Sequence, residues 1–507
     1  MLDDLVRLGP VLVMAGVAAL ILIWDILPTG RLPAPGGRAL LAGALAGPVG
    51  ATVWAAALLV SDERGSSFAS SVVLDDFTYF FTFLFAGIVT AVILASRDYA
   101  RRFGGQEPEF YALLLFATGS MMLLASSRDL ILIFVALELT SISQYVMAAL
   151  NRDERSTEAA IKYLLLGAVA SAVILYGMAF LFGLTGTTRL VAPPGEPSIA
   201  TAVAAHGGDM GVGLLLAVVF LVAGLGFKMA VVPFQMWVPD VYEGSPAPVA
   251  AFLSVASKAA GFAVVLRIFF DGLPDQVISA DWKTIFAVVA AVSMSVGNVL
   301  ALAQSNIRRL LGYSSIAQAG YLMVGLAAIS AADGGLSLGA SGVLFFLAAY
   351  ALTNLGAFIA VIAISDRLGS DLVADYGGLA RRSPLLAGGL ALGLVSLTGI
   401  PPTAGFVAKL YIFNAAIQSD LVWLAVIAVL NSVISAFYYL RVAGSMFVGE
   451  PATTAGLQTS YTLRFALVTA VAGILFVGLV PTPLLNAARD AARVFGGGGQ
   501  PTISRTR

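Results

Sequence analysis

The strongest constraint in this sequence is a series of long apolar segments separated by short polar connections. A helix needs about 20 apolar residues to cross the hydrocarbon core of a membrane, and only a helix or a closed barrel satisfies its backbone hydrogen bonds there. Fourteen such segments lie at 9–28, 38–60, 74–96, 109–126, 129–150, 158–185, 211–240, 247–270, 284–305, 307–330, 337–364, 385–416, 421–447 and 461–483. The sequence therefore predicts an all-α, polytopic membrane helix bundle of about 14 transmembrane helices.

Composition excludes several classes of protein. Hydrophobic residues make up 59% of the 507-residue chain and charged residues only 11%, whereas ordinary soluble domains carry roughly a quarter charged residues. The chain has no cysteine, which excludes disulfides, thiolate catalysis and cysteine-ligated metal sites. Its single histidine, His206, excludes a multi-histidine metal or haem site. A formal net charge of −1 offers no basic surface for nucleic acid.

The arginines predict how the chain is oriented. Short loops that face the cytoplasm carry an excess of Lys and Arg. The first segment is interpreted as a span and not as a cleaved signal, because Asp3 and Asp4 stand where a signal carries basic residues. Predicted inner loops hold Arg31, Arg38, Arg97, Arg101, Arg102, Arg152, Arg155, Arg308, Arg309, Arg367, Arg381, Arg382 and Arg441, and outer loops hold Arg64, Arg128, Arg189, Arg267 and Lys283. Both termini are thus predicted outside, against the tail residues Arg489, Arg493, Arg505 and Arg507.

Two predicted spans, the seventh and the twelfth, contain residues that break helices. The breaks are at Pro233 in 211–240, and at Gly399, Pro401 and Pro402 in 385–416. Proline lacks the backbone donor that continues a helix, so both spans are expected to be discontinuous. Breaks in corresponding spans are typical of an internal structural repeat with the functional site at the broken helices. We therefore expect two inverted five-helix repeats.

This repeat divides the chain into four parts. The predicted parts are an N-terminal three-helix segment at 1–108, a first antiporter-like repeat at 109–270, a second antiporter-like repeat at 271–448, and a last helix with its tail at 449–507. Little residue identity links the two proposed repeats, so the division depends on where the breaks and the lysines lie.

Lysine is rare in this sequence, and its placement differs from that of arginine. Only five of the 28 basic residues are lysines, whereas nearly all the arginines lie in polar connections. Lys228, Lys258 and Lys409 lie deep in apolar segments, while Lys283 lies at a segment edge. Arginine stays protonated under physiological conditions, whereas a buried lysine can release its proton. The deep lysines therefore favour a site that exchanges protons over one that only holds positive charge.

For Lys162, a position at the membrane interface is an alternative to a role in proton exchange. Lys162 follows Glu158 by one turn near the start of its helix. Its ammonium group could extend to the membrane interface while its stem packs along the helix. The three deeper lysines lie too far inside their apolar segments for their ammonium groups to extend to the interface in this way.

Glu138 is the carboxylate that lies deepest inside an apolar run. It is about nine residues from the start of its helix, which corresponds to roughly 13 Å of depth. Ser141 and Tyr145 follow on the same helix face and extend a polar stripe. A structural carboxylate satisfied by a neighbouring helix is the alternative, but ionisable groups inside a membrane usually mark ion pathways.

Small polar residues lie on several other helices between these charges. They are Ser293, Ser295, Asn298, Ser314, Gln318, Tyr321, Thr353, Asn354, Asn431, Ser435 and Tyr438. They fit either helix–helix hydrogen bonding or a partly hydrated path between the lysines, and the sequence leaves both open. Phosphate-binding loops and dinucleotide fingerprints are missing from the sequence, which argues against nucleotide-driven transport.

Five runs of residues resemble one family of proteins. The runs are LELTSISQYVMAAL, STEAAIKYLLLGAVASA, FKMAVVPFQMWVPDVYEGSPAPVAAFLSVASKAAGF, NIRRLLGYSSIAQAGYLMVGL and TGIPPTAGFVAKLYIF. In this order they resemble the antiporter-like membrane subunits of bacterial NADH:quinone oxidoreductase, respiratory complex I, and subunit N among them. The resemblance covers roughly 74–448.

The resemblance implies roles for particular residues. Glu138 matches the glutamate of the fifth helix, and Lys228 matches the lysine of the broken seventh helix that pairs with it. Lys258 matches the connecting lysine of the eighth helix. Lys409 matches the lysine of the broken twelfth helix, which hands the proton on, and Lys162 matches a further lysine on the sixth helix.

The family implies a proton-translocating subunit of an enzyme complex, without redox chemistry in this chain. FMN, iron–sulfur clusters and quinone are expected in other subunits, and no cofactor or metal is expected here. The implied partners are other complex I membrane subunits, including neighbouring antiporter-like ones, in a bacterial cell membrane.

Two other classes of function stay open from sequence. One is a subunit of a multisubunit cation/proton antiporter that works without a dehydrogenase, which a survey of neighbouring genes would distinguish. The other is a structural membrane scaffold, which would bear the desolvation cost of several buried lysines without using them.

Overall fold

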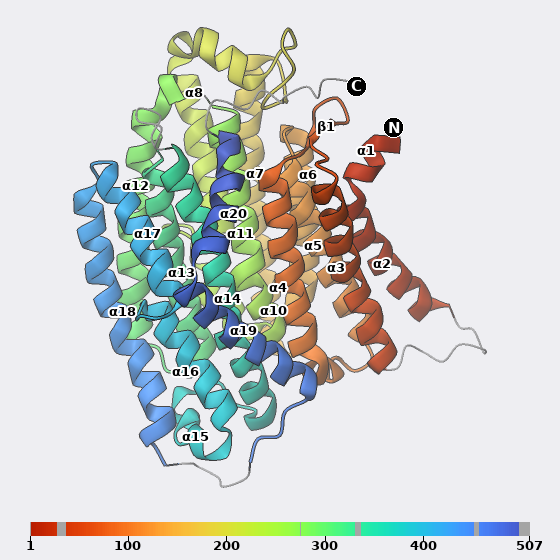
Figure 1. Cartoon of the computed structure of the whole chain (residues 1–507), viewed down its shortest axis with the longest axis vertical. Helices are drawn as coiled ribbons and strands as arrows, with labels where there is room; N and C mark the ends of the chain where they lie inside the picture. Colours follow the sequence, from red (N-terminus) through yellow and green to blue (C-terminus); the bar gives the residue numbers. More distant parts are fainter. Residues whose placement is uncertain (1, 28–36, 274, 330–335, 451–455, 496–507) are drawn as a thin grey trace.

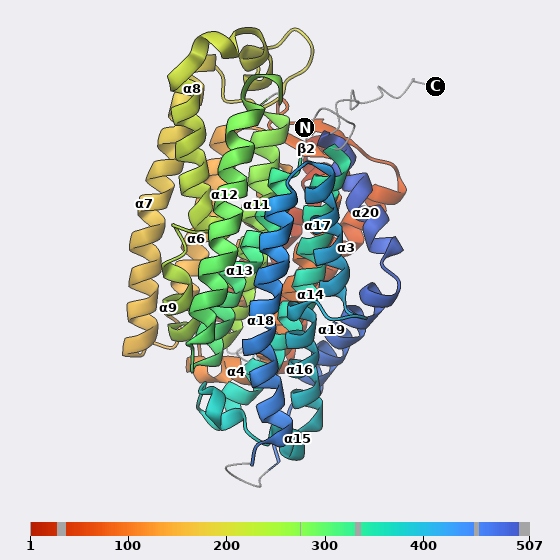
Figure 2. The same cartoon turned by 90° about the vertical axis from the view of Figure 1, so that its left-hand side faces the viewer.

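The computed structural model describes residues 2–27, 37–273, 275–329, 336–450 and 456–495. Within these ranges the molecule is a bundle of long helices that run roughly side by side along its longest axis (Figures 1 and 2). One two-stranded hairpin is the β-structure of the described part. The predicted all-α membrane bundle is therefore confirmed.

The N-terminal half contains eleven α-helices and the hairpin. Their bounds are α1 (Leu2–Arg7), α2 (Gly9–Ile26), α3 (Gly37–Val60), β1 (Gly65–Ser67), β2 (Val72–Leu74), α4 (Asp76–Ala100), α5 (Glu107–Ser126), α6 (Leu130–Ala148), α7 (Glu154–Thr185), α8 (Ile199–Met229), α9 (Trp237–Gly244), α10 (Ala247–Phe252) and α11 (Lys258–Leu266). The strands pair antiparallel. Two π-helical turns, Leu253–Ser257 and Arg267–Asp271, connect α10 to α11 and extend α11. Ala247–Asp271 is therefore one continuous span.

The C-terminal half contains nine more helices. Their bounds are α12 (Asp275–Leu302), α13 (Ile307–Ala327), α14 (Leu336–Leu368), α15 (Leu379–Arg382), α16 (Pro384–Thr398), α17 (Ala404–Gln418), α18 (Val422–Val448), α19 (Tyr461–Leu479) and α20 (Thr482–Ala492). Short 3-10 turns lie at Arg101–Phe103, Val373–Tyr376 and Arg493–Phe495.

Thirteen helices in the described ranges are long and apolar enough to cross a membrane, and each overlaps a predicted segment. The one remaining predicted segment, the twelfth at 385–416, contains α16 and α17, which have 15 residues each. The predicted start of 211–240 coincides with a kink inside a longer helix. Helix α8 begins at Ile199, where the Ser198 side chain caps it, and it kinks at Gly211. The polar stretch around His206 thus belongs to a helix that extends beyond the apolar segment.

The helices differ in how much of their surface is buried. Nearly all of α13, α14 and the Ala247–Asp271 span is buried in the chain itself, whereas most of α2, α7 and α19 is not. The outer helices expose large apolar side chains such as those of Val53, Leu165 and Phe465. Such surfaces fit contact with lipid or with other membrane subunits.

Both predicted helix-breaking sites lie in non-helical segments. Helix α8 ends at Met229 and α9 begins at Trp237, and Pro233 lies between them. Helix α16 ends at Thr398 and α17 begins at Ala404. Gly399 has a φ of +91°, a left-handed conformation that glycine adopts without a Cβ penalty. Pro401 and Pro402 complete this second connection.

The structure corrects one residue used for the orientation. Arg267 is not in an outer loop, because it lies in the Ala247–Asp271 span and is fully buried. Arg31, Arg505 and Arg507 lie outside the described residues. Helix α1 and the C-terminal end of α20 lie toward the same end of the bundle (Figure 1).

Candidate functional site

Lys228 is buried at the end of α8, one residue before the helix breaks. Its side chain is held by α6, which lies against it. The ammonium group donates hydrogen bonds to Ser141 Oγ and to Gln144 Oε1, each at 3.1 Å. Only 4% of Lys228 is exposed. The two neutral acceptors therefore replace the water that would hydrate the ammonium group. Neither acceptor holds the proton on the lysine as strongly as a carboxylate would.

Glu138 lies on the same α6 face and does not contact Lys228 directly. Although both residues lie in the described part, they form no ion pair. Glu138 accepts a hydrogen bond from Ser171 of α7. Ser141, one turn along α6 from Glu138, accepts from the lysine. The pairing implied by the family resemblance is therefore not a direct contact in this structure.

Gln144, which the sequence did not point to, connects three side chains. Its Oε1 accepts from Lys228, from Tyr163 Oη at 2.8 Å and from Ser257 Oγ at 3.2 Å. It therefore joins α6, α7, α8 and the segment that leads to Lys258. The predicted stripe continued from Ser141 to Tyr145 and missed Gln144, although Gln144 is also three residues beyond Ser141 and on that face. Tyr145 instead packs edge to face against Tyr163.

Lys258 begins α11 directly after the first π-helical turn. Its ammonium group donates to the backbone carbonyl oxygen of Ser315 in α13. It also lies 5.9 Å from the centre of the Tyr350 ring in α14. Only 2% of Lys258 is exposed. Lys258 thus lies between the helices of the first and second halves of the chain.

Lys409 lies in α17, after the second break, and reaches back across it. Its ammonium group donates to the carbonyl oxygen of Thr398 at 3.0 Å and to Ser432 Oγ at 3.3 Å. It also lies 4.4 Å from the centre of the Tyr321 ring. Thr398 is the last residue of α16, where unpaired carbonyl groups and the helix dipole favour a cation.

A polar network fills the second half between these lysines. Tyr321 is the acceptor of a 3.1 Å hydrogen bond from Ser432, and Tyr438 donates to Asn298 at 2.9 Å. Further hydrogen bonds join Asn298 to Asn431, Ser314 to Tyr439, Gln318 to the carbonyl of Leu397, and Asn354 to Ser254. Most of the small polar residues predicted from the sequence therefore do hydrogen-bond between helices.

Lys162 lies apart from the three buried lysines. Its side chain is 44% exposed and contacts Glu158 at 2.8 Å and Asp240 at 3.1 Å. This placement matches the interfacial alternative. The structure does not bring Lys162 into contact with Glu138 or Lys228.

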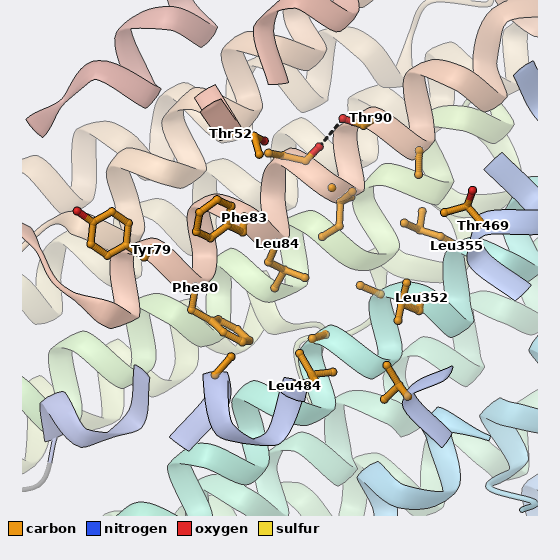
Figure 3. Close-up of a pocket in the computed structure, with 18 of the residues that line it drawn as sticks. Thr52, Tyr79, Phe80, Phe83, Leu84, Thr90, Leu352, Leu355, Thr469 and Leu484 are labelled. Atoms are coloured by element: carbon orange, nitrogen blue, oxygen red, sulfur yellow. Dashed lines mark hydrogen bonds between the residues drawn. The ribbon is translucent and has the colours of Figure 1, made fainter. Parts of the chain in front are cut away.

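A hollow with mostly apolar walls lies apart from this chemistry. It encloses about 1030 Å³ and is lined by α3, α4, α14, α19 and α20, with Phe80, Phe83, Leu84, Leu352 and Leu484 on its walls (Figure 3). None of the buried lysines lines it. No group of three or more His, Asp or Glu residues in the described ranges is placed to hold a metal ion.

The fold and the buried lysines define a class, that of the antiporter-like membrane subunits. The family described as NADH:quinone oxidoreductase/Mrp antiporter, TM matches residues 127–435. The NADH-quinone oxidoreductase subunit N of Dehalococcoides mccartyi is 43% identical over 438 residues, which are 85% of this chain and 88% of that relative. The chain therefore belongs to the subunit N family of NADH-quinone oxidoreductase. This confirms the resemblance drawn from the sequence.

Solved structures agree with this assignment. A chain in the structure of respiratory complex I from Thermus thermophilus with bound aureothin is 32% identical, with a TM-score of 0.76, over 95% of this chain and 99% of that chain. A chain of the Mrp complex from a Dietzia species has a TM-score of 0.82 at 21% identity, over 98% of both chains. The second likeness shows the shared fold alone. The chain is thus a subunit of a multi-subunit membrane complex.

Proposed function

We propose that this chain translocates protons through the buried series Glu138, Lys228, Lys258 and Lys409, driven by electron transfer in other subunits. The observation that carries the proposal is that, among the described residues, all three buried lysines donate only to neutral acceptors. An ammonium group held by hydroxyl, amide and carbonyl oxygens can lose its proton without leaving a carboxylate unpaired. Arginine would remain charged in the same position.

The spacing of polar groups supports continuity along the series. Gln144 joins Lys228 to Ser257, the residue before Lys258. Beyond Lys258, the polar network around Tyr321 leads to Lys409. Glu138 supplies negative charge one turn along α6 from Ser141, an acceptor of the first lysine. A shift of that carboxylate toward Lys228 would favour the ammonium form, and a shift away would favour proton release.

Several broader expectations are part of this proposal. The two breaks and the lysines beside them support two inverted five-helix repeats at 109–270 and 271–448, flanked by 1–108 and 449–507. FMN, iron–sulfur clusters and quinone belong to other subunits of the complex. Neighbouring membrane subunits, antiporter-like ones among them, are the partners, and the arginine distribution favours a bacterial cell membrane with both termini outside.

Lys228→Arg tests the proposed function. The variant keeps the positive charge but removes a proton that can be exchanged, so proton uptake by proteoliposomes carrying the assembled complex should fall at least tenfold. Lys283→Arg is the matched control, because Lys283 lies at the start of the apolar span Trp282–Leu302, and it should pump normally. Co-purification of the other subunits checks assembly. Full, coupled proton uptake by Lys228→Arg would overturn the proposal.

A further inference from the structure

The short helix α9 makes contacts that the proton path does not itself need. Its outward face carries Asp240 and Glu243, and its inward face carries Trp237 and Tyr242. It follows the break after α8 and is only eight residues long. Because non-helical residues separate it from α8, its position depends on side-chain contacts.

Asp240 ties α9 to both halves of the chain at once. One carboxylate oxygen lies 3.1 Å from Lys162 Nζ in α7, and the other lies 2.7 Å from Arg309 Nη1 in α13. Burial raises the pKa of Asp240, but hydrogen bonds from Arg309 and Lys162 outweigh it and hold that pKa below its usual range. The carboxylate therefore stays charged and bridges the two cations.

The other acidic residues of this cluster reach fewer groups. Glu243 contacts Arg309 at 3.0 Å and Asn306 at 3.3 Å, both in or next to α13. Glu158 contacts Lys162 within α7 and is 63% exposed. Among the described residues of the cluster, Asp240 is the acid that bridges α7 and α13.

The inward face of α9 contacts residues next to the first buried lysine. Trp237 Nε1 donates to the carbonyl oxygen of Phe227, the residue before Lys228, at 3.0 Å. The Trp237 ring stacks on Tyr163 with 4.5 Å between centres. Tyr163 in turn donates to Gln144, which holds Lys228. A displacement of α9 would therefore move both the backbone beside Lys228 and one of its acceptors.

The same face also contacts a residue that holds the second buried lysine. Tyr242 Oη lies 3.4 Å from Ser315 Oγ, and the carbonyl oxygen of Ser315 accepts the hydrogen bond from Lys258. Helix α9 thus contacts Tyr163, which donates to an acceptor of Lys228, and Ser315, whose carbonyl oxygen accepts from Lys258.

We propose that Asp240 is a positioning residue that sets the place of α9, and that α9 sets the geometry of the Lys228 and Lys258 sites. This inference depends on the proposed function. Relative movement of α7 and α13 is transmitted through the two ion pairs of Asp240 to both lysines. Asp240 itself does not carry the proton.

The test compares three neutralised acids in the assembled complex in proteoliposomes. Asp240→Asn should lower proton uptake per NADH oxidised at least threefold and speed amide hydrogen exchange in α9 and at Phe227 and Lys228. Glu243→Gln and Glu158→Gln are the matched controls, and both should stay within twofold of the unmodified complex in both measurements. A structural role alone would reduce the amount of assembled complex, not the ratio per complex.

Several outcomes would overturn the inference. Unchanged exchange in α9, or an effect of Asp240→Asn no larger than that of Glu243→Gln, contradicts it. If the Asp240→Asn complex does not assemble, Lys162→Met removes one of the two ion pairs of Asp240. Unchanged amide hydrogen exchange in α9 of that variant would then contradict the inference. Normal pumping by Lys228→Arg would instead remove the proposed function, so the two failures are distinguishable.

Discussion

At the scale of single residues, the site depends on neutral acceptors placed around buried ammonium groups. Ser141 and Gln144 hold Lys228, a backbone carbonyl holds Lys258, and Thr398 and Ser432 hold Lys409. A hydrogen bond to a charged group contributes about 1.5–3 kcal/mol. These contacts therefore have the strength to fix each lysine while leaving its proton exchangeable.

Replacing Gln144 tests this arrangement. Gln144→Leu removes an acceptor of Lys228 and the bridge to Ser257, so proton uptake by the assembled complex should fall about tenfold, since about 1.4 kcal/mol corresponds to a factor of ten. Ser143→Ala is the control, because Ser143 hydrogen-bonds only to Leu139 in its own helix. Equal uptake by the two variants would exclude Gln144 from the path.

At the scale of helices, the second break depends on the close approach of α16 and α17. Gly405 in the first turn of α17 donates its N–H to Ser396 Oγ at 3.1 Å. A Cβ at Gly405 would lie 1.9 Å from the carbonyl oxygen of Ser396. Only glycine fits there, and this contact determines how Lys409, one turn further on, meets the end of α16.

Gly405→Ala is therefore expected to push α17 away from α16. Overpacking of this kind costs about 1–3 kcal/mol, so the variant complex should unfold at a lower temperature and pump more slowly. Gly388→Ala in α16 is the control, because a Cβ there meets nothing within 4 Å. An unchanged melting temperature for Gly405→Ala would show that the connection adapts freely.

The sequence predicted the elements better than the contacts. The helix breaks at Pro233 and at Gly399–Pro402 could be predicted from residue type alone, because proline and glycine act directly on the backbone. The partner of Lys258 is a backbone carbonyl group, which every residue type has, so the sequence could not indicate it. Gln144 was missed because Tyr145, one residue further on, fitted a helical stripe about as well. Arg267 was misplaced because arginine is usually a loop residue in this chain.

At the scale of the whole molecule, a buried ion cluster joins helices that are distant in sequence. Arg267 donates to Asp75 at 2.8 and 2.9 Å, to Asp271 at 3.0 Å and to the carbonyl of Ala125 at 2.9 Å. Arg128 donates to Asp271 at 2.9 Å. The cluster connects the start of α4, the end of α5 and the end of the Ala247–Asp271 span.

Asp75→Asn should destabilise the assembled complex by about 3–5 kcal/mol, because it leaves a buried guanidinium short of negative charge. Asp62→Asn, whose side chain is 87% exposed, is the control and should have no effect. Thermal unfolding of the two variant complexes provides the comparison. Equal midpoints would mean that the cluster adds nothing to stability.

The pH dependence of this cluster has a definite sign. Burial raises the pKa of Asp75, but Arg267 and Arg128 outweigh it and hold that pKa below its usual value of 3.8. The stabilisation by Asp75 is therefore fully present above that value and is lost only as the pH falls through the lower folded value. The Asp75→Asn destabilisation should be the same at pH 6 and pH 8 in thermal unfolding.

The central claim is that protons move through buried lysines that link the two halves of the chain. Lys258 lies between those halves, so its exchangeable proton is the most direct point to test. The measurement is the number of protons moved per NADH oxidised by proteoliposomes carrying the assembled complex with Lys258→Arg. A lower ratio is predicted, with uncoupled NADH oxidation retained. An unchanged ratio would contradict the account.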